Sequence, residues 1–263
     1  MSDIAIIEHN LYGLYRLIAS SPVTRLFHGR GFCYFRNPDR IWPEMIYFPE
    51  PSSVEPIQLL DELVAMAREG QLPPWCLPSN LYTSKAFVSE LRRRSFYEGF
   101  WTGMAWSTQP TQPIAIPHLA CREIVAESDL SHWLDIVGPH LLGKDATDTH
   151  LFRYLFHQDE TQFFLGYENG RPVGAAMLFH ENAVTGMYFL VTHPDHRKKG
   201  VGRLMVNHLQ WQTWEKNTGI MVLQATKEGL SLYDRTGFRR VAPISMFNLL
   251  HSDLPVPEST ENP

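Results

Sequence analysis

The sequence is poor in cysteine and contains no long apolar run. Its three cysteines, Cys33, Cys76 and Cys121, are odd in number and far apart, which argues against a disulfide framework and a Cys-x-x-Cys site. No stretch approaches the ~20 apolar residues of a membrane-spanning helix. The first residues also lack the basic start and apolar core of a secretory signal. The sequence therefore predicts a cytoplasmic protein that does not enter a membrane.

Excess positive charge is absent as well. The formal charge of −5 over 263 residues argues against general nucleic-acid binding, and the run Arg92-Arg93-Arg94 is typical of a solvated helix face. Twelve histidines are present, but His193-x-x-His196 lacks the His-Glu-x-x-His pattern, so we expect no metal site. The hydrophobic fraction of 44% is that of a globular protein with one large domain or two small ones.

One turn of the chain combines glycine with positive charge. Residues 185–192 predict a strand and residues 204–211 a helix, and between them stands Arg197-Lys198-Lys199-Gly200-Val201-Gly202-Arg203. The first turn of a helix presents unpaired backbone N–H groups, and glycine lets the backbone approach a ligand closely. The turn therefore predicts a site for a phosphate or diphosphate, although a surface turn with solvated lysines is the alternative.

Two motifs identify a family resemblance. The turn lacks the glycine patterns of a nucleotide P-loop and of a dinucleotide fold. Its Arg-x-x-Gly-x-Gly resembles motif A of the GNAT superfamily of acetyl-CoA-dependent N-acetyltransferases. Beyond a second buried strand at 219–225, the pattern Leu232-Tyr233-x-x-x-Gly237-Phe238 resembles motif B of the same superfamily. The resemblance covers about residues 118–250.

The resemblance implies an α/β (α+β) fold with a GNAT-like mixed central sheet flanked by helices. We expect the acetyltransferase domain at 119–251, after a proline-rich linker at 108–118. Residues 1–107 alternate predicted helices and strands, and would form a degenerate GNAT-like half in tandem or an unrelated accessory α/β domain. The predicted helices are 4–21, 54–69 and 85–94, and the predicted strands are 31–36, 44–48 and 97–106, with 73–78 a short strand at best. The polar tail at 252–263 is expected to be flexible.

The family resemblance also implies acetyl-CoA as cosubstrate. Backbone N–H groups of the glycine turn would hold its diphosphate, and the preceding strand would take its pantetheine arm as an added strand. The residues implied in cofactor binding are Leu190, Val191, Thr192, Arg197, Lys198, Lys199, Gly200, Val201, Gly202, Arg203, Thr226 and Tyr233.

Catalytic roles follow from the same resemblance. The Leu190 N–H would stabilise the oxyanion, and Tyr233 would act as general acid toward the leaving thiolate. The strand position that carries a glutamate base in some relatives falls at about Gly186, which leaves the base open. Glu181 is the first candidate base, and the other candidates are His180, Glu123 and Tyr188.

The predicted function is acetyl transfer to a primary amine by direct attack in a ternary complex, since no cysteine lies near either motif. The acceptor is open: a small amine, an amino acid, an antibiotic, or a protein N-terminus or lysine. Aromatic residues that could line its site are Trp42, Trp101, Trp106 and Tyr188. We expect a monomer or homodimer. The alternative function is a non-catalytic acyl-CoA-binding regulatory or interaction module.

Overall fold

The computed structural model of the protein describes residues 1–37, 44–143 and 147–251. The chain divides into two compact units. Among the described residues, the first unit holds Met1–Arg25 and the described part of Thr102–Ala242. The second unit holds Leu26–Arg36, residues 44–101 and residues 243–251. No helix within the described ranges is both long and apolar enough to cross a membrane. The predicted tail at 252–263 lies outside the described residues.

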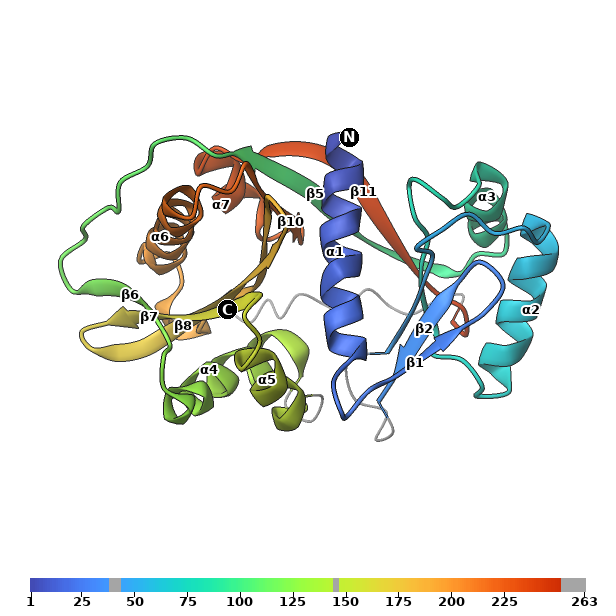
Figure 1. The fold of residues 1–263 in the computed structure, drawn as a ribbon, viewed down its shortest axis with the longest axis horizontal. Coiled ribbons are helices and arrows are strands. Elements are labelled where there is room, and N and C mark those ends of the chain that lie inside the picture. Colours follow the sequence, from blue (N-terminus) through green and yellow to red (C-terminus); the bar gives the residue numbers. More distant parts are fainter. Residues whose placement is uncertain (38–43, 144–146, 252–263) are drawn as a thin grey trace. The chain divides into compact units, whose positions relative to one another are not determined.

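The first unit is built on a mixed sheet, which confirms the predicted α/β fold class (Figure 1). Strand β10 pairs parallel to β9 and antiparallel to β5, and the remaining neighbours in this unit pair antiparallel. The strands lie in the order β5 (Tyr97–Ser107), β10 (Ile220–Ala225), β9 (Val184–Thr192), β8 (Arg171–Glu181), β7 (Thr161–Glu168) and β6 (Leu119–Glu123).

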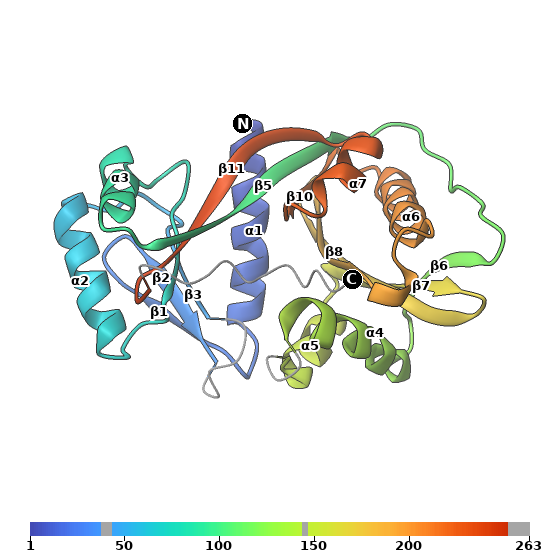
Figure 2. The same cartoon turned by 180° about the vertical axis from the view of Figure 1, so that it is seen from behind.

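Helices cover both faces of this sheet (Figures 1 and 2). Neighbouring side chains of a strand point to opposite faces. On β7, Phe163 packs on Trp133 of α4 (Leu130–Val137) with ring centroids 4.9 Å apart. The next residue, Phe164, packs on His208 of α6 (Val201–Glu215) at 5.9 Å. Helices α4 and α5 (Thr149–Phe156) therefore cover the face opposite α6.

The N-terminal helix α1 (Asp3–Ala19) belongs to the first unit, where it packs against β8, β9, β10 and α5. The structural division therefore differs from the predicted domain boundary at residue 107. The reason is that the apolar stripe of α1, with Ile7, Leu11 and Ile18, is buried against that sheet rather than against the elements that follow it in sequence.

The predicted linker at 108–118 also lies within the first unit, because both of its ends belong there. It runs beside α6, where the Ile114 N–H donates to the Asn207 side-chain oxygen at 2.6 Å. Two strands connect the units instead. Strands β5 and β11 (Arg239–Asn248) each have residues in both units.

The second unit has an apolar core of its own. Its strands lie in the order β1 (Arg25–His28), β2 (Cys33–Arg36), β3 (Met45–Tyr47), β4 (Trp75–Leu77) and β11. Helices α2 (Pro56–Arg68) and α3 (Lys85–Arg93) pack against each other. The predicted helices and strands are present, and β1 is an additional strand. That this unit is a degenerate GNAT-like half stays a prediction.

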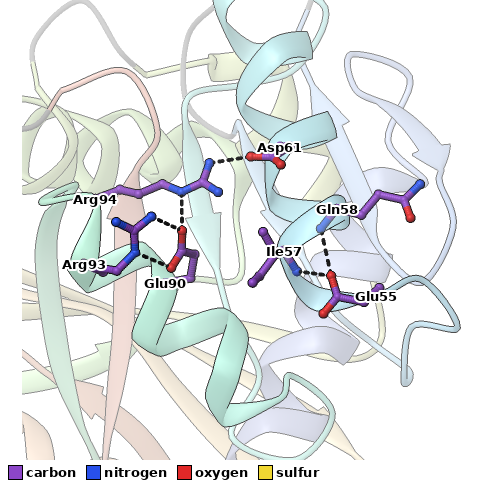
Figure 3. Close-up of polar contacts among 7 residues, drawn as sticks. All are labelled: Glu55, Ile57, Gln58, Asp61, Glu90, Arg93 and Arg94. Carbon is purple, nitrogen blue, oxygen red and sulfur yellow. Dashed lines mark hydrogen bonds and ion pairs between the residues drawn. The ribbon is translucent and has the colours of Figure 1, made fainter.

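The arginine run of the second unit is neutralised by carboxylates (Figure 3). Glu90 accepts from Arg93 at 2.6 Å and from Arg94 at 2.8 Å, and Arg94 also pairs with Asp61 of α2 at 2.7 Å. Arg92 pairs with Glu98 at 2.7 Å. These arginines therefore tie α3 to its surroundings, and each of the three has a carboxylate partner.

Candidate functional site

The parallel strands β9 and β10 separate after only three registered pairs, the last of which is Gly186 with Val222. Beyond that pair, β10 stays paired with β5 through Ala225, and β9 stays paired with β8 through Thr192. The facing edges of β9 and β10 are thus unpaired with each other over the rest of their described length. An open strand edge can take an added extended ligand, as predicted for the stretch that contains Leu190 and Thr192.

A bulge in β9 lies at this opening. Tyr188 is opposite Met177 and Val191 is opposite Ala175, so Phe189 and Leu190 together face the single residue Ala176. Phe189 has a φ of +54°, a strained value for a bulky residue. Such strain persists only where the surroundings hold the conformation.

Aromatic packing holds the bulge in place. The Phe189 ring packs on Trp133 at 5.7 Å and on Phe152 at 5.4 Å. The Trp133 Nε1–H donates to the Ala176 carbonyl at 2.9 Å, which satisfies an acceptor on β8 at the point where the bulge disrupts the ladder. Leu190, on the other side of β9, packs with the apolar cluster under α6.

The glycine turn leads directly into α6, as the motif predicts. Gly200 is the N-cap residue with φ +93°, and Lys198 before it has φ +61°. No side chain within the described ranges caps the helix, so its first N–H groups and the positive end of its dipole remain available. A Cβ on Gly202 would lie 3.2 Å from Leu232 and 3.6 Å from the Thr192 hydroxyl, so this glycine allows a close approach to both.

The basic residues of the turn differ in their partners. Lys198 and Arg203 are exposed, and no ion pair to them occurs in the described part of the chain. Arg197 donates from Nε to the Thr192 carbonyl at 3.2 Å. Lys199 lies 3.5 Å from the Glu168 carboxylate. Two of the four basic side chains of the turn are therefore already in contact with other groups of the protein.

Glu168 is a residue of the site that sequence reasoning missed. It ends β7 and also hydrogen-bonds His196, which precedes the glycine turn, and this bond is the main reason that the pKa of Glu168 lies below the ordinary value. The carboxylate thereby joins the β7–β8 hairpin to the loop before α6. The sequence signal was weak, because an acid before Asn169-Gly170 also suits an ordinary hairpin turn.

Tyr233 lies on α7 (Leu230–Arg235) and belongs to the same apolar cluster as Val201. Leu190 packs against this cluster. Its ring is 5.7 Å from that of Phe238. Burial raises the pKa of the Tyr233 hydroxyl, so it stays protonated at neutral pH and can donate a proton. The tertiary structure thus brings the two motifs to one place. Thr226, by contrast, is exposed, and its carbonyl accepts from the Gly229 N–H at 3.1 Å.

The structure constrains the candidate bases without selecting one. Glu181, at the end of β8, forms an ion pair with Arg16 of α1 at 2.7 Å. His180 is partly buried and contacts Gln162 at 2.8 Å, and burial lowers its pKa to about 4, so it is neutral at pH 7. Glu123 accepts from the Gln162 amide at 2.8 Å.

The aromatic residues predicted to line the acceptor site lie in different environments. Burial raises the pKa of the Tyr188 hydroxyl, which disfavours the ionised form that a base would need at neutral pH. Trp106 is a core residue with 3% of its surface exposed, and Trp101 lies in the second unit. Trp42 lies outside the described residues.

Comparison with known proteins finds a family match for part of the chain. Residues 159–240, which hold both motifs, match the family model described as an acetyltransferase (GNAT) domain. This part of the chain is therefore similar to a GNAT acetyltransferase domain. It is also 35% identical over 87 residues to the uncharacterized N-acetyltransferase YitH of Bacillus subtilis (strain 168), a match that spans 32% of this chain and 30% of that protein.

Solved GNAT structures resemble the chain over most of its length. A GCN5-related N-acetyltransferase from Kribbella flavida has a TM-score of 0.66 at 16% identity, and covers 92% of this chain and 95% of its own. Another from Sphaerobacter thermophilus has a TM-score of 0.61 at 14% identity, with 84% and 81% covered. At such low identity these likenesses show the GNAT fold and nothing finer.

Replacement of Glu168 by glutamine tests the contact between the β7–β8 hairpin and the loop that leads into α6. Because the native fold lowers the pKa of Glu168, its ionised form stabilises the protein above the unfolded pKa of about 4.3, and this stabilisation is lost as the pH falls through the folded value. We expect the variant to melt a few degrees below the wild type at pH 7. The difference should shrink below about pH 4.

Differential scanning calorimetry of both proteins between pH 3 and 8 measures this effect. Glu228→Gln is the matched control, since Glu228 is exposed on the loop before α7. A melting difference for Glu168→Gln that stays constant across the pH range would contradict the role given to the carboxylate.

Proposed function

We propose that this protein transfers an acetyl group from acetyl-CoA to a primary amine by direct attack within a ternary complex. The observation that carries the proposal is one continuous path. The open edge of β9, the bulge at Phe189 and the uncapped start of α6 follow one another within residues 187–203. This path offers backbone groups for an extended arm and then donors for a diphosphate.

Acetyl-CoA fits the residues along this path. Its diphosphate would be bound by the N–H groups of residues 198–203, with Lys198 and Arg203 as exposed cations beside it. Its pantetheine arm would add to β9 at Leu190 and Thr192. Gly200 and Gly202 are required for the approach of the ligand, since one has a positive φ and the other lies against Leu232.

The chemistry requires one proton to leave the amine and another to reach the thiolate. The amine lone pair attacks the thioester carbon, and the Leu190 N–H stabilises the negative charge that develops on oxygen, an effect typically of a few kcal/mol. When the C–S bond breaks, Tyr233 donates its proton to the sulfur. Glu181 is the proposed base, provided that it exchanges its partner Arg16 for the substrate amine.

An acetylation screen tests this function. Purified protein, acetyl-CoA and a panel of polyamines, amino acids, aminoglycosides and peptides are monitored for release of free thiol and for an acetylated product by mass spectrometry. We expect coenzyme A binding by calorimetry and turnover with at least one class of amine. Binding without turnover would favour the non-catalytic acyl-CoA-binding module, and absence of binding would contradict both functions.

We further propose that the protein acts in the cytoplasm as a monomer or homodimer. Size-exclusion chromatography with light scattering, run with and without coenzyme A, distinguishes the two assemblies.

A further inference from the structure

A polar cluster lies where β9 and β10 separate. Beyond the last pair, Gly186 with Val222, the next side chains on the same face are Tyr188 and Gln224, because side chains alternate along a strand. Helix α1 packs against these two strands and places Asn10 on this face. The Tyr188 hydroxyl donates to the Asn10 side-chain oxygen at 2.8 Å.

Gly186 makes room for this cluster. A Cβ at position 186 would lie 2.0 Å from the Asn10 oxygen and 2.4 Å from the Tyr188 ring. The amide of Asn10 therefore occupies the space that any side chain at position 186 would need. A residue from the N-terminal helix thus stands beside the opening at a place where β9 itself contributes no side chain.

Two donors of this cluster make no hydrogen bond of ordinary geometry. The Asn10 Nδ2 and Gln224 Nε2 atoms are buried, and neither forms a hydrogen bond with any described residue. Asn10 is only 2% exposed, and its amide can satisfy Tyr188 with only one of its two ends. The Gln224 amide interacts with the Tyr188 hydroxyl and lowers its pKa against the larger effect of burial, but its Nε2 atom makes no hydrogen bond of ordinary geometry. Buried donors of this kind require an acceptor atom from a ligand or a water molecule.

The polar atoms of the cluster favour an oxygen ligand. Glu181, the proposed base, lies near Tyr188 and pairs with Arg16 at 2.7 Å, so the amino group of a substrate would face Glu181 while an oxygen of the same substrate would face the cluster. The unsatisfied atoms are both N–H donors, which would repel an ammonium group and bind a carboxylate or carbonyl oxygen.

We infer that Asn10, Tyr188 and Gln224 form the acceptor subsite, and that it selects an amine bearing a carboxylate or carboxamide oxygen close to the amino group. This inference rests on the proposed acetyl transfer, because the opening beside the cluster is where the thioester would meet the amine. The acceptor is then an amino acid or its amide, and simple diamines are poor substrates.

Matched acceptors test the inference. Each set contains an amino acid, its amide and its decarboxylated amine, for example lysine, lysinamide and cadaverine, or phenylalanine, phenylalaninamide and phenethylamine. We expect kcat/KM to fall about 10- to 100-fold when the oxygen-bearing group is removed. Equal rates for the acid and the amide identify a carbonyl ligand, and a strong preference for the acid identifies a carboxylate ligand.

Two isosteric substitutions test the donors themselves. Asn10→Asp and Gln224→Glu each replace an N–H donor by a carboxylate oxygen of similar shape. We expect each to raise KM for the acid at least 10-fold and to leave KM for the decarboxylated amine and the dissociation constant of coenzyme A unchanged. Asn169→Asp adds the same charge at the β7–β8 turn, where φ is +50°, and should behave as the wild type.

Three outcomes would overturn the inference. Equal kcat/KM values across a matched set would do so while leaving the acetyl transfer intact. If kcat/KM fell equally for the acid and the decarboxylated amine in both variants, with unchanged melting temperatures, the two donors would instead bind the thioester carbonyl. Absence of transfer to every acceptor would remove the proposed function and the subsite together.

Discussion

Replacement of Gly200 by aspartate is expected to raise the dissociation constant of coenzyme A by about 30- to 150-fold. The new carboxylate would stand at the start of α6, where the diphosphate is proposed to bind, and repulsion of about 2–3 kcal/mol is reasonable for a partly solvated pair of charges. Space is not limiting, since a Cβ here would lie 3.6 Å from Ile116 and 3.7 Å from Leu119. Isothermal titration calorimetry with coenzyme A measures the change.

Gly200→Asn is the matched control for this prediction. Asparagine has nearly the same shape and the same relative tolerance of positive φ, so it carries the same backbone strain at φ +93° without the charge. We expect it to weaken binding only several-fold. Equal losses for the two variants would mean that backbone conformation, rather than charge at a diphosphate site, accounts for the effect.

Replacement of Tyr233 by phenylalanine is expected to lower kcat about 100-fold, because general acid catalysis typically contributes at least that factor. Phenylalanine keeps the packing against Phe238 and Val201, so the affinity for coenzyme A should change less than about threefold. Steady-state kinetics with the best acceptor from the screen, together with calorimetry, separate the two quantities.

The pH profile gives a second measure of the same residue. Because burial raises the pKa of Tyr233, the wild-type rate should keep its protonated acid through neutral pH and lose it only at strongly alkaline pH. Tyr154→Phe is the control, since its hydroxyl contacts Ser20 at 3.2 Å, away from both motifs. If Tyr233→Phe turned over as fast as Tyr154→Phe, the acid role would be lost and Tyr233 would be a packing residue.

The parts of the site that sequence could predict are those encoded by neighbours in the chain. The turn at 197–203 and the pattern Tyr233-x-x-x-Gly237 were recognisable because glycines at fixed spacing meet a local backbone requirement. The strand before the turn was recognisable by composition, yet its bulge was not. Phe189 adopts φ +54° only because Trp133 and Phe152 pack against its ring.

In the domain organisation, too, local elements were predictable from the sequence, but the contacts that they make were not. The helical periodicity of residues 4–21 predicts α1 correctly. The apolar stripe of a helix does not, however, specify which strands the helix will pack against. Proline and polar residues at 108–118 predict an irregular segment, and only the contact between Ile114 and Asn207 shows that it lies along α6.

Residues close together in the chain were enough to predict most helices and strands, the glycine turn before α6 and the GNAT resemblance, because each of these depends on local sequence. The folded chain was needed to show that Glu168 contacts Lys199 and His196, and that Asn10 contacts Tyr188 across 178 positions. Such contacts arise when separately formed elements bury their apolar faces together, and no local periodicity specifies which polar side chains then become neighbours.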